Sequence, residues 1–175
     1  MQSVSGRRQS VKRRRVVKVG GSLFDLPDLV ERLRPWLPAL FVPGGGALAD
    51  AVRTLHRIHG LSEERSHWLA LRACSVHADF LASLLQLPVV ADPLHSPGVL
   101  DAFAFCQADE AHPEHLPHTW QATSDSVAAR VAERTQAELI LLKSTAGPLE
   151  SVVDPFCPEI IRRAQLSVRI VNARA

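Results

Sequence analysis

Hydrophobic residues alternate along this chain between short apolar runs and longer stripes at helical spacing. Runs of strand length occupy residues 16–19, 40–42, 89–91, 102–105, 138–142 and 167–171. Stripes with apolar positions three and four residues apart occupy 26–33, 47–58, 63–87 and 124–132. Because the predicted strands mostly alternate with helices, the pattern predicts one α/β domain with a largely parallel sheet covered on both faces.

The stripe over 63–87 predicts the longest helix, beginning after Ser62 and ending before Pro88. Ser62 is a good N-cap, and acidic residues in the first turn suit the helix dipole. Two apolar sets repeat along it at helical spacing: Leu71, Cys74, Ala78, Leu81 and Leu85, and beside them Val76, Phe80, Leu84 and Leu87. Together they predict a broad buried face, and the same face suits a helix-to-helix homodimer.

Two apolar runs end in glycine-rich turns that lead into helices. The first turn is Lys18-Val19-Gly20-Gly21-Ser22, and the second is Val42-Pro43-Gly44-Gly45-Gly46. Glycine lets a backbone approach a ligand closely, and a helix start offers unpaired N–H groups and a positive dipole end. Each turn alone also fits a plain strand-to-helix connection. Their repetition in one domain predicts two sides of one anion site at the carboxyl edge of the sheet.

Charged residues follow later elements in positions that suit the same edge. Lys143 directly follows the predicted strand 138–142, where open α/β sheets hold ligands. A lysine that emerges from a buried strand needs an anionic partner, either a phosphate or an acid such as Asp125. Asp125 lies in Thr123-Ser124-Asp125-Ser126, which opens a helix, so capping and the helix dipole are sufficient local reasons for these residues.

The segment 107–121 has two prolines and three histidines at intervals of three, His112, His115 and His118. Such a trio would spread around a helix, and no cysteine or acidic ligand stands at a recognised metal-site spacing from it. We therefore predict no metal site here, and expect a mobile loop over the anion site.

Composition fits a globular cytoplasmic protein. The first 15 residues hold six of the 20 basic side chains and no acid, so the rest of the chain is acidic on balance. We assign residues 1–15 to a basic disordered leader and 16–175 to a single domain. The leader lacks the apolar segment of a secretory signal, the three cysteines are expected to be reduced, and no apolar run is long enough for a membrane span.

Taken together, Lys18–Ser22, Val42–Gly46, Thr123–Ser126 and Leu142-Lys143-Ser144 resemble the amino acid kinase superfamily, which includes acetylglutamate, aspartate, carbamate and uridylate kinases. The stretches Trp120–Ser126 and Val153-Asp154-Pro155-Phe156 are most similar to the small branch of the aminomethylfuran phosphate kinase of methanofuran biosynthesis and its tetrahydromethanopterin-linked bacterial relatives.

This resemblance implies a three-layer α/β/α sandwich and an ATP-dependent transfer of a phosphoryl group to a small acidic or phosphorylated metabolite. It implies that Lys18 and Lys143 neutralise the transferring group and that Asp125 holds the two lysines in place. The remaining implied site residues bind the phosphoryl group and the acceptor: Gly20, Gly21, Ser22, Gly44, Gly45, Gly46, Thr123 and Ser124. The resemblance also implies Mg²⁺ that arrives with the nucleotide, and a homodimer or higher homo-oligomer.

The chain departs from the family pattern in three places. Gln121 stands where the branch has an aspartate, and Ser144–Pro148 replaces an acidic turn. Only 32 of the 175 residues follow Lys143, which predicts a reduced nucleotide half. A non-catalytic binder of an anionic metabolite is therefore the alternative to a kinase. We do not expect nucleic acid or a membrane as a partner, although tethering of nucleic acid by the basic leader is a third interpretation.

Overall fold

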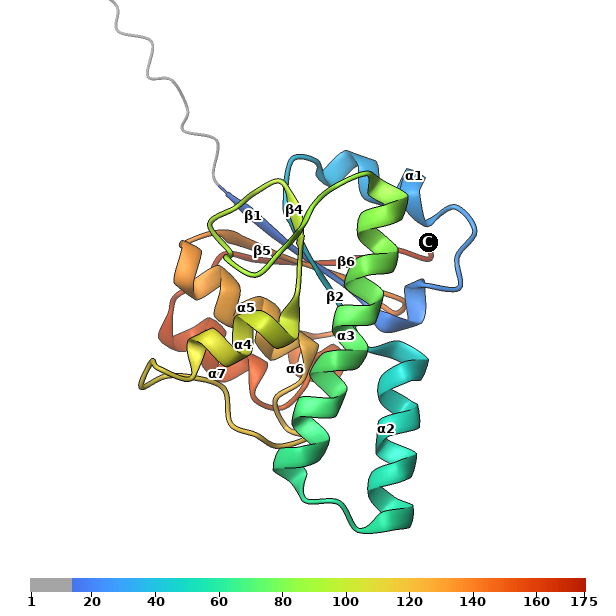
Figure 1. Cartoon of the computed structure of the whole chain (residues 1–175). Helices are drawn as coiled ribbons and strands as arrows, with labels where there is room; N and C mark the ends of the chain where they lie inside the picture. The colour runs from blue at the N-terminus through green and yellow to red at the C-terminus, as the bar shows by residue number, and fades with distance from the viewer. Residues whose placement is uncertain (1–13) are drawn as a thin grey trace, which may run out of the picture.

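A parallel six-stranded sheet forms the centre of the molecule (Figure 1). The computed structural model describes residues 14–175. The strands are β1 (Arg15–Val19), β2 (Leu40–Pro43), β3 (Val89–Val90), β4 (Gly98–Leu100), β5 (Glu138–Lys143) and β6 (Val168–Asn172). Their order is β3-β4-β2-β1-β5-β6, and every neighbouring pair is parallel. The predicted α/β class is therefore confirmed.

Helices cover both faces of this sheet. They are α1 (Leu29–Leu33), α2 (Gly46–His59), α3 (Glu63–Leu85), α4 (Ala102–Asp109), α5 (Ser124–Thr135), α6 (Leu149–Val152) and α7 (Cys157–Arg163), with 3₁₀ turns at Gly21–Leu23 and Arg34–Trp36. In Figure 1, α2 and α3 run side by side and project beyond the sheet. The predicted helix start at Ser62 is confirmed, because its Oγ accepts a hydrogen bond from the Arg65 N–H at 3.2 Å.

Alternate residues of the central strands enter two separate cores. Val16, Leu139 and Leu141 pack with α4, α5 and α7 on one face. Val17 and Ile140 pack on the other face with α1 and the second half of α3. Because successive side chains of a strand point to opposite faces, both faces of a central strand must be apolar when helices cover both. The result is the three-layer α/β/α arrangement that the family resemblance implies.

The strand predicted at 102–105 is wrong, because these residues form the first half of α4. Asp101 caps that helix, and its Oδ1 accepts a hydrogen bond from the Ala104 N–H at 3.1 Å. The strand in this region is β4, just before the helix, where Gly98 and Val99 pair with Leu40 and Phe41 of β2. An apolar run of four residues does not by itself distinguish a strand from a buried helix, so the cap and the strand pairing decide.

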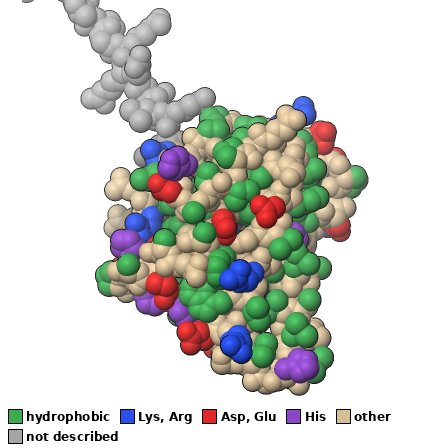
Figure 2. Space-filling model, in the orientation of Figure 1, with side chains coloured by type: hydrophobic (Ala, Val, Ile, Leu, Met, Phe, Trp, Pro, Cys, Tyr) green, Lys and Arg blue, Asp and Glu red, His purple; other side chains and the backbone are tan. Residues whose placement is uncertain are grey.

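The broad buried face predicted for the longest helix is only partly correct. Its first apolar set is buried except for the half-buried Leu85, whereas Val76 is 56% and Phe80 46% exposed. On α2 the apolar stripe also reaches the surface, with Ile58 68% exposed. Figure 2 shows hydrophobic side chains at the surface over α2 and α3. By length and composition α3 could also cross a membrane, but it packs on the sheet through Leu71, Cys74 and Leu81, as a core helix does.

The first strand begins slightly before the predicted start of the domain. β1 already includes Arg15, whose Nη2 donates a hydrogen bond to the Leu37 carbonyl at 3.1 Å, so the described domain begins inside the predicted leader. The remainder of that leader, residues 1–13, lies outside the described residues. The three cysteines, Cys74, Cys106 and Cys157, are buried and free, as expected for reduced thiols.

Candidate functional site

The two glycine turns lie against each other at the carboxyl ends of β1 and β2. A Cβ added to Gly21 would lie 2.3 Å from the Gly46 nitrogen, and one added to Gly44 would lie 2.8 Å from the Gly21 nitrogen. Gly46 also has a φ of +47°, which L residues with side chains rarely adopt. Glycine is therefore required at these contacts because the two backbones touch.

The amides of the turns divide into two groups. The Gly20 N–H donates to the Leu142 carbonyl at 2.9 Å, and the Gly44 N–H donates to the Val19 carbonyl at 2.8 Å. Within the described part of the chain, the N–H groups of Gly21, Gly45 and Gly46 donate to no backbone carbonyl. The anion-binding role implied for the Gly20 amide is therefore wrong, because this N–H joins the end of β1 to β5. The N–H groups of Gly21, Gly45 and Gly46 are the ones available to an anion.

Lys18, Asp125 and Lys143 form one buried ion cluster next to these turns. The Lys18 Nζ lies 2.7 Å from the Asp125 Oδ1, and the Lys143 Nζ lies 2.8 and 2.7 Å from Oδ1 and Oδ2. Lys18 and Asp125 are buried, and Lys143 is half-buried. β1 and β5 are neighbours with parallel register, so their ends bring the two lysines to one carboxylate from α5.

Opposite charges keep this cluster ionised although it is buried. Burial alone would raise the pKa of Asp125, but the two lysines outweigh it and lower that pKa. Burial would likewise lower the pKa of Lys18, yet the Asp125 carboxylate outweighs it and raises that pKa. Burial and the charge of Lys18 lower the pKa of Lys143. The cluster holds two cations on one anion, and an incoming anion would balance the excess charge.

Asp154 fixes the turn that carries Asp125, a role that the resemblance of Val153–Phe156 to the family did not specify. Its carboxylate accepts hydrogen bonds from the N–H groups of Thr123 (2.9 Å), Ser126 (3.0 Å) and Cys157 (3.0 Å) and from both hydroxyls of Thr123 and Ser126. The Asp154 N–H in turn lies 3.2 Å from the Asp125 Oδ2. Thr123 thus contacts Asp154, and its implied role in binding a ligand remains a prediction.

The other hydroxyls expected at the site lie at its rim. The Ser22 Oγ donates to the Ser144 Oγ at 2.9 Å, which ties the first glycine turn to the segment after β5. Ser124 lies at the start of α5, and its Oγ would be 3.2 Å from a Cβ on Gly44. Both serines line a pocket that opens over the glycine turns.

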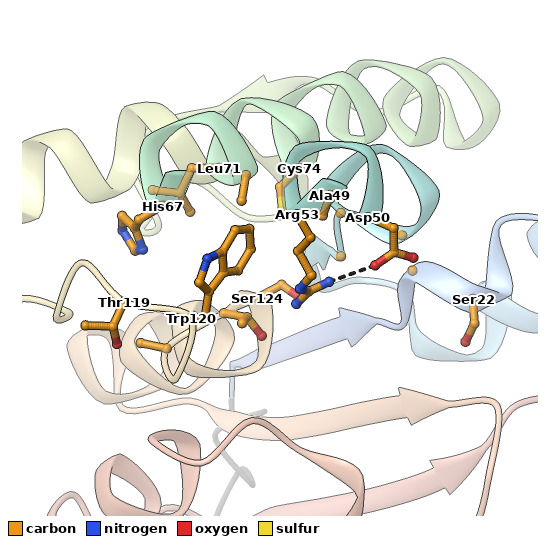
Figure 3. Close-up of a pocket in the computed structure, with 17 residues that line it drawn as sticks. Ser22, Ala49, Asp50, Arg53, His67, Leu71, Cys74, Thr119, Trp120 and Ser124 are labelled. Atoms are coloured by element: carbon orange, nitrogen blue, oxygen red, sulfur yellow. Dashed lines mark hydrogen bonds and ion pairs between the residues drawn. The ribbon is translucent and has the colours of Figure 1, made fainter. Parts of the chain in front are cut away.

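A pocket of about 190 Å³ opens over the glycine turns (Figure 3). In Figure 3 the Trp120 ring stands between His67 and Arg53, and a dashed line joins Arg53 to Asp50. The Arg53 Nη1 lies 2.8 Å from the Asp50 Oδ1, and its guanidinium carbon lies 4.7 Å from the centre of the Trp120 ring. The pocket therefore combines an aromatic face, a cation and a carboxylate above the free amides.

Two histidines of α3 support this pocket. His77 contacts the Gly44 carbonyl through Nδ1 at 2.6 Å and stacks on Phe24 at 4.2 Å between ring centres, so it fixes the second glycine turn. His67 lines the pocket, and burial together with the neighbouring His118 lowers its pKa to about 4. Both histidines lie on a helix whose pattern is typical of a core helix. That pattern does not distinguish a histidine that lines a pocket from one that only packs.

Known proteins share this fold. No protein-family model matches the sequence. The uridylate kinase of Archaeoglobus fulgidus has a similar structure, with a TM-score of 0.63 and 18% identity over 90% of each chain. The UMP kinase of Bacillus anthracis has a TM-score of 0.60 and 12% identity over 93% of this chain and 88% of that one.

One curated protein is also similar in sequence. The [5-(aminomethyl)furan-3-yl]methyl phosphate kinase of Methanocaldococcus jannaschii is 22% identical over 194 residues, covering 91% of this chain and 88% of that protein. The fold is the one seen in the uridylate kinases. Together with this distant sequence similarity, it confirms the resemblance to the amino acid kinase superfamily.

Proposed function

We propose that this protein is an ATP-dependent kinase that transfers the γ-phosphoryl group to a small metabolite with an ionised oxygen. The single observation that carries the proposal is the pair of buried lysines on one carboxylate, beside three free amides of two touching glycine turns. Phosphoryl transfer needs positioning and charge neutralisation more than covalent catalysis, and this site supplies both.

The proposed transfer is an in-line displacement. The acceptor oxygen forms a bond to the γ-phosphorus while the bond between that phosphorus and the bridging oxygen of ADP breaks. Lys18 and Lys143 face the charge on the transferred group, and the amides of Gly21, Gly45 and Gly46 bind its oxygens. Mg²⁺ would arrive with the nucleotide and neutralise its phosphates.

The state of Asp125 limits the acceptor. Both of its oxygens contact lysines, and its pKa is lowered, so it is not a good general base. A carboxylate or phosphate acceptor needs no base because its oxygen is already ionised. This supports an acidic or phosphate-bearing substrate rather than an alcohol.

The pocket residues support a more specific acceptor. Trp120 offers a face for a flat ring, Arg53 a cation for a phosphate, and the exposed Asp50 an anion for an amine. The Methanocaldococcus protein takes an aminomethylfuran methyl phosphate, which has all three groups. We propose this compound as the first substrate to test. The corresponding setting would be one-carbon cofactor metabolism.

The second candidate is a non-catalytic protein that binds an anionic metabolite in the same pocket. It is favoured by the segment Ser144–Pro148, which has no acidic residue after Lys143. The Ser22 to Ser144 contact ties part of this segment to the first turn.

ADP release with Mg²⁺-ATP and the aminomethylfuran phosphate tests the proposal. We expect turnover in the native protein, and a loss of about 10²–10³ in kcat for Lys18→Met, the range for removing one group that stabilises transition-state charge. Arg57→Met, which removes an exposed cation of α2, is the matched control and should keep full activity. Stabilisation by the phosphate without any effect of nucleotides would favour the binder. Turnover that survives Lys18→Met would refute the assigned chemistry.

We further propose that the chain forms a homo-oligomer through α2 and α3. Exposed apolar side chains on these helices support this, with Leu55 47%, Ile58 68%, Val76 56% and Phe80 46% exposed. Exposed apolar side chains on two adjacent helices are typical of an interface.

A further inference from the structure

Three side chains at the end of α4 converge in a way that the sequence did not predict. Glu110 is the C-cap residue of α4, and His115 and His118 follow in the segment that leads to α5. One ligand atom from each lies within 4.8 Å of the others. His112, the third histidine of the sequence motif, lies elsewhere, in a pocket with Asp109 and Arg134.

The distances from Glu110 to the two histidines are close to those between ligands of one metal ion. The His118 Nε2 lies 3.0 Å and the His115 Nδ1 3.5 Å from the same oxygen, Oε1 of Glu110. Two ligands about 2.0–2.1 Å from a tetrahedral Zn²⁺ lie about 3.3 Å apart. Coordination through His115 Nδ1 would replace its present 3.1 Å contact with the Leu116 carbonyl.

The surroundings of His118 also fit a metal ligand. Its Nε2 faces Glu110, while its Nδ1 lies 3.8 Å from Oε1 of Glu64 on α3. A histidine that binds a metal through one nitrogen usually directs the other to a carboxylate, which orients the ring. His118 is further held by His67 and Trp68, each with its ring centre 5.0 Å away. The ring is therefore positioned from α3 and from its own segment.

We propose that Glu110, His115 and His118 bind one divalent transition-metal ion of the Zn²⁺ type. Two imidazoles and one carboxylate are a ligand set that zinc uses in proteins, with a fourth position left for water. Glu110 and His115 are exposed, so that position is open to solvent. The inference stands on this cluster alone and does not depend on the proposed kinase activity.

The site would connect three parts of the fold at one point. Glu110 belongs to the end of α4, His118 packs on α3, and the next two residues, Thr119 and Trp120, line the pocket over the glycine turns. An ion bound here would hold the segment that positions Trp120. The ion is expected to make the pocket wall more rigid. It would not contact a ligand in the pocket, because His118 itself does not line it.

Calorimetric titration of the full, tag-free chain with ZnCl₂, after treatment with a chelator, tests the site. We expect one Zn²⁺ per chain and a higher melting temperature, since a metal that binds the folded state stabilises it. Glu110→Gln and His118→Ala should each abolish this binding. Glu64→Gln, at the carboxylate beyond the ligand, should weaken it about tenfold.

His112→Ala is the matched control, because it removes a histidine of the same segment that lies outside the cluster. Binding that persists in this variant and is lost in Glu110→Gln and His118→Ala supports the site. Absence of binding to the native chain overturns the proposal, and so does equal binding in all variants or loss in the control. The visible spectrum of bound Co²⁺ gives an independent measure of four-coordinate geometry.

Discussion

Replacing Asp125 by asparagine tests the ion cluster directly, because it removes one negative charge and keeps the side-chain shape. The three side chains are largely buried, with 5% of Lys18, 7% of Asp125 and 12% of Lys143 exposed. With an effective dielectric constant of about 20, each 2.7 Å contact contributes about 6 kcal/mol of attraction. Desolvation of three charges and repulsion between the lysines reduce this sum.

The expected net cost of Asp125→Asn is about 3–5 kcal/mol in the free energy of unfolding, the range for breaking a buried ion pair. In a domain of this size that corresponds to a fall of roughly 6–20 °C in Tm. Urea unfolding followed by circular dichroism measures the first quantity, and a thermal scan measures the second. Asp79→Asn, at an exposed position of α3, is the control and should change stability by less than about 0.5 kcal/mol.

Anions provide a second measurement on the same variant. With Asp125 neutral, the two lysines lose their internal counterion, so pyrophosphate should raise the Tm of Asp125→Asn more than that of the native protein. If the variant is as stable as the native chain and pyrophosphate acts equally on both, the buried cluster does not have the energetic role assigned to it.

Three further predictions follow from neighbouring features. Gly46→Ala should lose about 1–3 kcal/mol of stability, because a side chain is strained at φ +47° and its Cβ would lie 2.8 Å from the Gly21 carbonyl oxygen; urea unfolding measures this. Asp154→Ala should lower the free energy of unfolding by at least about 1–3 kcal/mol, because it leaves buried donors unpaired. An unchanged Tm would show that Asp154 does not stabilise the turn before α5. The lowered pKa of Asp125 stabilises the fold above that carboxyl's ordinary value of 3.8, and this stability is lost as pH falls through the lower folded value. The stability gap between native protein and Asp125→Asn should therefore be complete at pH 7 and close in acid.

Self-association is the last prediction. Phe80→Asp should shift the species seen by light scattering toward the monomer, because it places a charge on the exposed apolar surface of α3. Asp79→Asn, the adjacent exposed position, serves as the control. A native chain that is already monomeric at high concentration would end the proposed pairing through α2 and α3.

A signal for the ion cluster was present in the composition. The chain has only three lysines among its 20 basic residues, and the two described ones meet at Asp125. Lysine carries a compact point charge on a flexible stem, which suits two cations that share one carboxylate. The resemblance marked the segment of Asp154 but not the role of its carboxylate, because the partners of that carboxylate are mostly backbone amides and hydroxyls of a distant segment.

Features that depend on neighbouring residues could be predicted before the fold was known. Strand and helix periods, the cap at Ser62 and the two glycine turns are local, because side-chain spacing and backbone freedom are set by a few adjacent positions. They were sufficient for the α/β class and for the position of Lys18 and Lys143 at strand ends.

Features that depend on which helices and strands become neighbours could be seen only in the folded protein. Pairing with β2 made 98–100 the strand and left 102–105 to a helix. The parallel register of β1 and β5 brought two lysines to one carboxylate, and the end of α4 brought Glu110 to two histidines. The strand pairings and the ion cluster join positions far apart in the chain, and Glu110 and its histidines are separated by a segment without a regular period. No periodicity encodes such contacts, because they arise only when helices, strands and loops pack together.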